Sequence, residues 1–351
     1  MERPAGTFNE TYEQDLAIVR TPMQWGLLIG FLILLFTMPL YASPYILGIF
    51  NVIGITVIAV LGLQILTGLG GQITLAQAAL VGVGGYTSAL LVTHAGFPWL
   101  VALPCAGLSA GIIGLIFGLP ALRVKGFYLA FATLAAQFLL VWVFMHVKPD
   151  LLGGTDGIVV PPIKIGGAVL KSQQSVFPII MGITVLMTLF AKNLMRTKTG
   201  RALIAIRDND IAAEMMGIDL YRYKIIAFFI CSFYAGIAGS LWAHYMRSLH
   251  PEVFTLMNSI WYLGMLIVGG MGSTVGAIFG VVFLRALNEG VVVLSPLIAG
   301  VFPALDLTIF PALTQALFGL IIVLFIILEP RGLAHWWETF KASYRLWPFT
   351  Y

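Results

Sequence analysis

A long stretch without charged side chains constrains this chain more than any other feature. No Lys, Arg, Asp or Glu occurs between Arg20 and Arg123. A charge at the centre of a lipid bilayer costs about 3 kcal/mol or more, so such a gap fits several consecutive membrane spans joined by short loops. The composition agrees, because 60% of the residues are hydrophobic and 10% are charged, against roughly a quarter charged in soluble domains. We therefore expect an all-α, polytopic transmembrane helical bundle.

The apolar segments set the expected number of spans. One span needs ~20 apolar residues, which leaves room for about eight to ten spans in a chain of this length. Segments 68–85 and 264–280 are interrupted by glycines, and paired broken helices in the two halves of a transporter often mark its transport site. The span count depends on 286–306, which is weakly apolar. The expected spans are 25–41, 46–66, 75–92, 99–119, 128–146, 176–194, 225–245, 260–282, a weak segment at 291–301, and 309–328.

Basic residues in the loops set the expected orientation. Cytoplasmic loops carry an excess of Lys and Arg, and the densest basic stretch is 192–224. We therefore expect this stretch, both termini and a turn containing Arg285 on the cytoplasmic side. The expected organisation is a cytoplasmic segment 1–24, a transmembrane domain 25–335 with a cytoplasmic loop 195–224, and a cytoplasmic tail 336–351. Tryptophans near the span ends fit an aromatic belt at the membrane interfaces, and they are Trp25, Trp99, Trp336 and Trp337.

The sequence lacks the motifs of the common enzyme classes. It contains no G-x-x-x-x-G-K-[ST] phosphate loop, no H-E-x-x-H and no G-x-S-x-G. The five histidines show no metal-ligand spacing. Cys105 and Cys231 lie in apolar stretches, so we expect them to pack helices rather than form a disulfide. The net charge of +4 reflects basic loops and does not indicate nucleic-acid binding. We expect no catalytic residues, no metal site and no cofactor on this chain.

The polar loop 196–224 is the most informative segment. Residues 201–216 have helical character, with apolar residues in clusters between charged ones. Asp208 or Asp210 could begin a short helix near Ile211, and Gly217 stands where a C-terminal cap belongs. The expected product is a short amphipathic helix at the membrane surface. Physical chemistry alone leaves two interpretations open, a solvated connector that lies against the membrane and a docking element for a soluble partner.

Several motifs in this order resemble one transporter family. Ile211-Ala212-Ala213-Glu214 followed by Gly217 resembles the coupling-loop signature of ABC importers, although Glu follows the two Ala here and precedes them in the general pattern. The family in question is the branched-chain amino-acid permease family (LivM-type subunits). The matching segments are G-R-A-L-I-A-I-R-D-N-D-I-A-A-E-M-M-G-I from Gly200 to Ile218, T-G-L-G-G-Q-I-T-L-A-Q-A-A from Thr67, A-L-R-V-K-G-F-Y-L-A-F-A-T-L from Ala121, G-G-T-D-G-I from Gly153, V-G-G-M-G-S-T-V-G from Val268, and E-P-R-G-L from Glu329.

The resemblance implies an assembly of several subunits. It implies a type II ABC importer-like bundle that pairs with a homologous second permease subunit, as a heterodimer in preference to a homodimer. Two ATPase subunits would bind ATP and Mg, and an extracytoplasmic binding protein would deliver the solute. The implied location is the bacterial cytoplasmic (inner) membrane. The implied solute is a branched-chain amino acid, with urea, short amides and small organic acids as alternatives. The implied coupling residues are Gly200, Arg201, Arg207, Ile211, Ala213, Glu214 and Gly217.

Uncharged polar residues within apolar segments are candidates for the solute pathway. A zwitterion or an amide could hydrogen-bond to such groups without meeting a fixed charge. The alternative is that they make hydrogen bonds between helices. In the outer loop, a contact with the binding protein and a simple Gly-Thr-Asp-Gly turn are both open. The candidates are Gln64, Gln72, Thr74, Gln77, Gln137 and Asn258, with Thr155 and Asp156 in the outer loop.

A secondary transporter is the main rival to the importer. Ion-coupled carriers usually place an acidic or basic side chain inside a span. The only candidates here are Asp306 and Glu289, both near the ends of the weak segment. This pattern argues against ion coupling, and a requirement for a separate ATPase would distinguish the two classes.

Overall fold

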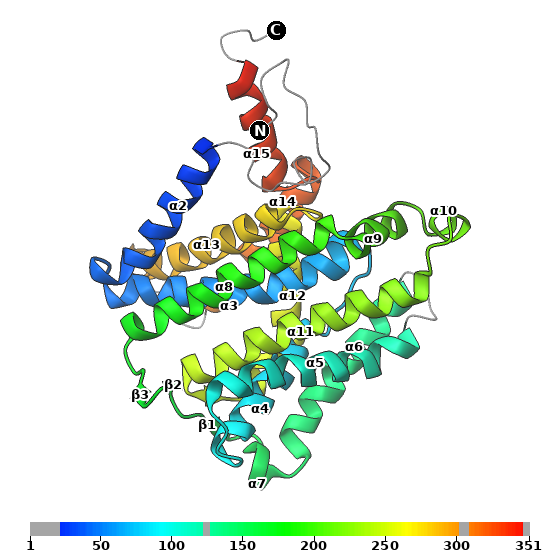
Figure 1. Ribbon diagram of the computed structural model, residues 1–351. Helices are drawn as coiled ribbons and strands as arrows, with labels where there is room; N and C mark the ends of the chain where they lie inside the picture. Colours follow the sequence, from blue (N-terminus) through cyan, green and yellow to red (C-terminus); the bar gives the residue numbers. More distant parts are fainter. Residues whose placement is uncertain (1–21, 122–126, 302–308, 347–351) are drawn as a thin grey trace.

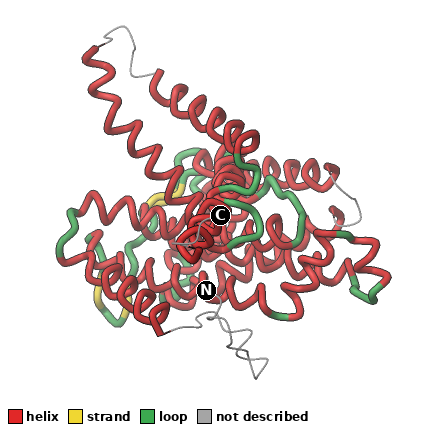
Figure 2. The backbone as a smooth tube through the Cα atoms, turned by 90° about the horizontal axis from the view of Figure 1, so that it is seen from above, coloured by secondary structure: helices red, strands yellow, loops and turns green. Residues whose placement is uncertain are grey.

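The computed structural model describes residues 22–121, 127–301 and 309–346. Most of the segment 1–24, the basic turn 122–126, Asp306 and the end of the tail lie outside these residues. Helices make up nearly all of the described backbone, and strands only a few short pieces (Figure 2). The helices are α2 (Pro22–Thr37), η1 (Met38–Leu40), α3 (Pro44–Leu63), η2 (Gln64–Leu69), α4 (Gln77–Thr93), α5 (Trp99–Ala121), α6 (Phe127–His146), α7 (Pro149–Leu152), α8 (Gln173–Arg196), α9 (Lys198–Asp208), α10 (Asp210–Met215), α11 (Leu220–Met246), η3 (Pro251–Phe254), α12 (Leu256–Gly269), α13 (Thr274–Val301), α14 (Ile309–Leu328) and α15 (Leu333–Leu346).

The described residues form a multi-pass helical bundle. They contain 7 helices that are long and apolar enough to cross a membrane, or up to 8 if the bent pair Thr314–Leu328 and Leu333–Ser343 is one span. Helices α4 and α12 are apolar but have only 17 and 14 residues. At 1.5 Å per residue they reach about 25 and 21 Å, less than the ~30 Å hydrocarbon core. Each of these two helices is therefore too short to cross the hydrocarbon core by itself.

The expected span 260–282 is wrong as one continuous helix. Helix α12 ends at Gly269. The chain then turns through Gly270 and Gly272, which have φ values of +109° and +95°. Helix α13 follows and runs unbroken from Thr274 to Val301. The weak segment 291–301 is the last part of α13 and not a separate element. Arg285 therefore lies inside α13 rather than at a turn. Hydropathy averages over a few glycines and so cannot detect a break that depends on positive φ.

Helix α11 lies at the centre of the bundle and packs closely on α4 and α5 (Figure 1). The close approach depends on glycines, because a Cβ at Gly236 would clash with the Ala106 carbonyl and a Cβ at Gly239 with the Val81 carbonyl. Small residues of this kind let helix backbones approach within lipid. Helix α2, by contrast, stands away from the bundle, and none of its described residues is buried (Figure 1).

The two ends of the bundle differ. Helices α9 and α10 project from one end, which we call the α9 end (Figure 1). The other end, the strand end, carries β1 (Ile158–Val159) paired antiparallel with β4 (Ser248–Leu249), and a hairpin of β2 (Lys164–Ile165) with β3 (Ala168–Val169). Trp99 does not fit the expected aromatic belt, because its side chain is 2% exposed and packs edge-on against His244.

Candidate functional site

Helix α4 begins inside the protein without a capping side chain of its own. Its N-cap residue is Ala76, which offers no acceptor, yet the first amides of a helix need partners where water is absent. Ser259 of α12 accepts from the Ala78 amide at 2.9 Å, and Gln137 of α6 accepts from the Ala79 amide at 3.0 Å. Two other helices therefore supply the cap that the local sequence lacks.

Gln137 joins the starts of two short helices. Its Oε1 also accepts from the Ser259 hydroxyl at 3.0 Å, and its Nε2 donates to the Phe254 carbonyl, just before α12, at 2.6 Å. Gln77 performs a similar task, because its Nε2 donates to the Ala59 carbonyl at 2.7 Å and its Oε1 accepts from Cys231 at 3.3 Å. Gln77 and Gln137 are buried, and in this conformation both make hydrogen bonds between helices.

A second group of the candidates lies at the α9 end. Helix α3 continues into six π-helical residues, Gln64–Leu69, and such irregular turns often occur at functional positions. The Gln64 amide oxygen accepts from the backbone amides of Gly272 and Ser273, each at 2.7 Å, in the amide orientation that satisfies both groups. The break after α3 is therefore bonded directly to the break between α12 and α13.

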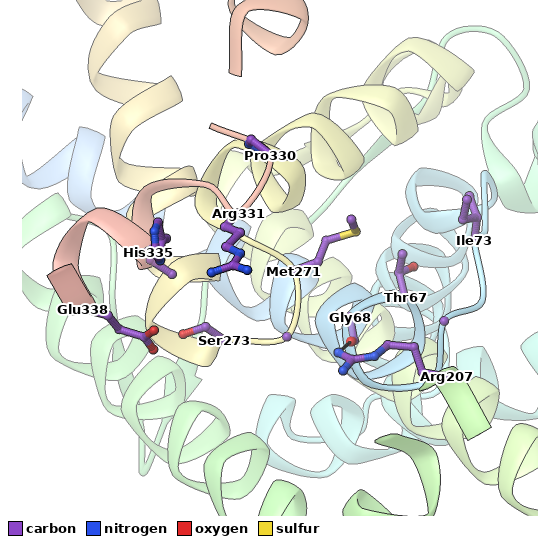
Figure 3. Close-up of a pocket in the computed structure, with 13 residues that line it drawn as sticks. Thr67, Gly68, Ile73, Arg207, Met271, Ser273, Pro330, Arg331, His335 and Glu338 are labelled. Atoms are coloured by element: carbon purple, nitrogen blue, oxygen red, sulfur yellow. Dashed lines mark hydrogen bonds between the residues drawn. The ribbon is translucent and has the colours of Figure 1, made fainter. Parts of the chain in front are cut away.

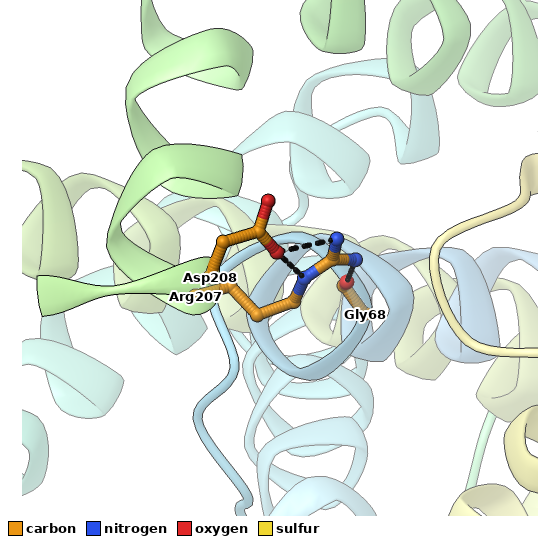
Figure 4. A network of polar contacts seen from close by, with 3 residues as sticks. All are labelled: Gly68, Arg207 and Asp208. Atoms are coloured by element: carbon orange, nitrogen blue, oxygen red, sulfur yellow. Dashed lines mark hydrogen bonds and ion pairs between the residues drawn. The ribbon is translucent and has the colours of Figure 1, made fainter.

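Arg207 of α9 reaches the same junction. Its Nη1 donates to the Gly68 carbonyl at 2.9 Å, and its Nε and Nη2 pair with Asp208 at 3.0 and 2.9 Å (Figure 4). A Cβ at Gly71 would lie 2.9 Å from Arg207 Cγ, and a Cβ at Gly272 would lie 3.2 Å from Arg207 Nη1. Glycines at both breaks therefore make room for this one side chain.

A cavity of about 670 Å³ opens at this junction. Its walls come from four separate parts of the chain, namely η2 and the residues after it, Arg207, the 271–273 turn, and the segment that runs from Arg331 into α15 with His335 and Glu338 (Figure 3). Four of the motif segments noted in the sequence thus meet in one place. Their functional relation could not be inferred from their separation along the chain.

The segment 196–217 folds as two short helices. Asn209 separates them and caps α10, because its Oδ1 accepts from the Ala212 amide at 3.0 Å. The helix does begin at Asp210, as expected, but the capping residue is Asn209, which has the extended backbone that a cap requires. Gly217, with φ +81°, follows the end of α10 as expected. Gly200 is buried where α9 crosses the end of α8, and a Cβ there would clash with the Leu194 carbonyl.

Helix α10 exposes a large apolar surface at the far edge of the α9 end (Figure 1). Ile211, Met215 and Met216 are 65%, 85% and 84% exposed. Glu214 is exposed beside them, whereas Ala213 is buried against the chain. Exposed apolar patches with a charged rim are typical of protein-docking surfaces. Arg201, one turn into α9, is also exposed.

The remaining candidates are divided between the two regions and the strand end. Gln72 and Thr74 are buried in the extended segment between η2 and α4, where the Gln72 carbonyl accepts from the Thr67 hydroxyl at 2.8 Å. Asn258 is half-buried at the start of α12 and donates to the Val253 carbonyl. Thr155 and Asp156 are exposed in a turn that the Asp156 amide closes on the Gly153 carbonyl at 3.1 Å.

Sequence reasoning missed several polar residues. Ser259 and Thr133 were not noted, although the Leu75 amide donates to Thr133 Oγ1 at 3.0 Å. Single hydroxyls are common in membrane helices, so no sequence signal separates these two from the others. Arg285 and Glu289 were noted but assigned to a turn and to a weak segment. Cys105 and Cys231 are free thiols, as expected.

Comparisons with known proteins agree on one family. The family model described as "Branched-chain amino acid transport system / permease component" matches residues 45–326. The high-affinity branched-chain amino acid transport system permease protein LivM of Escherichia coli K12 is 30% identical over 286 residues, which are 75% of this chain and 67% of that protein.

Other transport permeases also resemble this chain. A probable branched-chain amino acid transport permease protein LivM of Methanocaldococcus jannaschii is 28% identical over 67% of each chain. The ribose import permease protein RbsC of Escherichia coli K12 is 30% identical over 116 residues, 32% of this chain and 36% of that protein. No solved structure matches the chain significantly. The chain is a multi-pass membrane protein that belongs to the branched-chain amino acid permease family of ABC transporters, a family of transport subunits that work with ATPase and binding-protein partners.

Proposed function

We propose that this chain forms, with a homologous second permease subunit, the solute pathway of an ATP-driven importer of branched-chain amino acids. The named cargo of the relatives that match two thirds or more of the chain supports this solute class. The observation that supports the ATPase partner most strongly is the apolar surface of α10, where Ile211, Met215 and Met216 are exposed beside Glu214.

The α9 end is the cytoplasmic end in this proposal. Both termini then lie in the cytoplasm of a bacterium with the chain in its inner membrane, and two ATPase subunits that hold ATP and Mg dock on α10. The strand end faces outward. Its exposed turn with Thr155 and Asp156 is then accessible to an extracytoplasmic binding protein, and a contact there would position that protein over the pathway.

Arg207 gives the proposed coupling a physical path. A displacement of α10 moves α9, and the bond from Arg207 to the Gly68 carbonyl transfers that motion to η2. Gln64 transfers it further to the turn between α12 and α13. Both short helices then shift relative to the long spans, which would open the pathway to one side at a time. Such switching requires that each state be stabilised by different contacts.

A pull-down in mild detergent from the native membrane, followed by mass spectrometry, tests the proposed assembly. The expected result is co-purification of a second permease and one or two ATPases. Isolation of this chain alone, folded and active in liposomes without ATP, would contradict the importer and favour a secondary transporter. Competition of uptake by urea, short amides and small organic acids then tests the alternative solutes, and the proposal expects only branched-chain amino acids to compete.

A further inference from the structure

Helix α13 carries two opposite charges one helical turn apart. Arg285 and Glu289 stand four residues apart and so lie on the same face. That face is turned toward α3, because Arg285 Nη2 donates to the Thr56 hydroxyl at 3.2 Å and the Tyr45 hydroxyl donates to Glu289 Oε2 at 2.9 Å. Tyr262 of α12 is near enough to interact electrostatically with Arg285.

The position of these charges along α13 places them within the membrane. Arg285 follows the start of the helix by about 17 Å at 1.5 Å per residue, close to the middle of a ~30 Å hydrocarbon core. Both side chains are half-buried, so neither is sealed inside the chain. Lipid cannot stabilise an exposed charge at this depth, and ionisable residues in spans accordingly face a water-filled cavity or a polar partner. A polar partner or water, rather than lipid, therefore covers this face of α13.

The described residues do not supply all the hydrogen-bond partners that Arg285 needs. Arg285 Nε is buried without a hydrogen-bond partner among the described residues. The Thr56 hydroxyl accepts from one Arg285 nitrogen while it donates to the Val52 carbonyl at 2.7 Å. Across the described ranges, no ion pair joins Arg285 to Glu289 within 4.0 Å. A guanidinium has five N–H donors in a planar fork that matches a carboxylate, and Arg285 donates to one described residue, at the Thr56 hydroxyl.

We propose that Arg285 and Glu289 form a zwitterion site for the transported amino acid, with the guanidinium binding the α-carboxylate and the Glu289 carboxylate binding the α-ammonium beside Tyr45. This inference rests on the proposed function and narrows its solute class. Urea and neutral amides carry neither charge and would leave both side chains unpaired in the membrane, which is costly. A free zwitterion pairs both charges at once, and its apolar side chain is left to contact the surrounding helices.

The test uses the complete transporter in proteoliposomes and a thiol-labelling assay. Asn288 is half-buried between the two charges along the helix, so Asn288→Cys, with both native cysteines replaced by serine, reports access of a water-soluble methanethiosulfonate reagent. Leucine, 4-methylpentanoate, which lacks the ammonium, and 3-methylbutylamine, which lacks the carboxylate, are applied as protecting ligands at millimolar concentration. Arg222→Gln serves as the control, because Arg222 is an exposed arginine at the α9 end.

The expected result is labelling that leucine suppresses and that the two half-ligands do not. Arg285→Gln should abolish the protection and lower leucine uptake at least about tenfold, because it leaves a desolvated carboxylate without its partner. Glu289→Gln should let 4-methylpentanoate protect as well as leucine does. Arg285→Lys should retain part of the activity, and Arg222→Gln should match the parent.

Three outcomes would overturn the proposal. One is an assembled Arg285→Gln transporter that takes up leucine within about twofold of the parent, well short of the effect of losing a buried charge partner. A second is an Asn288→Cys thiol that the reagent never reaches. The third is loss of pairing with the second permease in both Arg285→Gln and Glu289→Gln, which would assign the charges to the subunit interface. Absence of ATP-dependent leucine uptake by the parent transporter would instead contradict the proposed function itself.

Discussion

At the scale of single residues, one side-chain amide supplies hydrogen-bond partners to two buried backbone groups. Gln137 accepts from the Ala79 amide and donates to the Phe254 carbonyl, and both groups lie where water is scarce. The sequence marks Gln137 as unusual, because an amide in an apolar span needs a partner. It cannot tell whether the partner is solute or protein, since that depends on which helices the fold brings together.

Gln137→Leu should destabilise the protein by roughly 2–6 kcal/mol, because two buried backbone groups lose their partners at about 1–3 kcal/mol each. Ser259→Ala, which removes one acceptor, should cost less. Thr188→Val is the matched control, since the Thr188 hydroxyl bonds only within its own helix, to the Thr184 carbonyl. Thermal unfolding of the purified transporter measures all three, and equal melting temperatures for Gln137→Leu and the control would contradict the role assigned to Gln137.

Arg207 is the residue that joins α9 to the two chain breaks. Arg207→Gln should lower solute uptake strongly while the ATPase subunits still hydrolyse ATP, because the bond to the Gly68 carbonyl is lost and docking through α10 is not. The number of ATP molecules hydrolysed for each solute imported measures this effect. An unchanged ratio in Arg207→Gln would show that the motion takes another route.

At the scale of helices, close packing around α11 depends on positions that only glycine can occupy. Gly236→Val should lower the stability of the bundle by about 1–3 kcal/mol or more, as overpacking of a close helix contact does. Gly182→Val in α8 is the control, since nothing lies within 4 Å of a Cβ at that position. Thermal unfolding in detergent compares the two, and equal effects would show that the Gly236 contact carries little of the packing energy.

Helix α10 should act through its charge as well as its apolar surface. Glu214→Lys reverses an exposed charge without touching the core, so the complex should still assemble while ATP hydrolysis and uptake become uncoupled. Co-purification of the subunits and parallel assays of the two activities provide the measurement. Normal transport by this variant would remove Glu214 from the coupling contact.

Most of the apolar helices could be predicted from the sequence to within a few residues, including the short helix α4, whereas the break between α12 and α13 could not. Helices α5, α6 and α8 coincide with expected spans, because a continuous apolar run of span length has only one stable form in lipid. The α12–α13 break escaped prediction, because it rests on two glycines with positive φ. The prediction that Arg285 lies at a turn was wrong for a related reason. A charge within a span is tolerated only where tertiary partners exist, and the sequence does not show those partners.

At the scale of the whole molecule, motifs scattered along the chain converge at the α9 end. The segments that begin at Thr67, Gly200, Val268 and Glu329 line one cavity of about 670 Å³, next to the exposed apolar surface of α10. Their presence could be read from the sequence, whereas their meeting depends on the fold. The arrangement connects the proposed docking surface to both breaks in the spans, which is the geometry that the proposed coupling requires.

The most direct test of this account is solute uptake by the complete transporter reconstituted in proteoliposomes, with leucine as solute and its binding protein outside. An ATP-driven importer should accumulate leucine only with hydrolysable ATP at the α9 end, and this accumulation should persist when ion gradients are collapsed. Uptake that continues without the ATPase subunits and follows an ion gradient would contradict it.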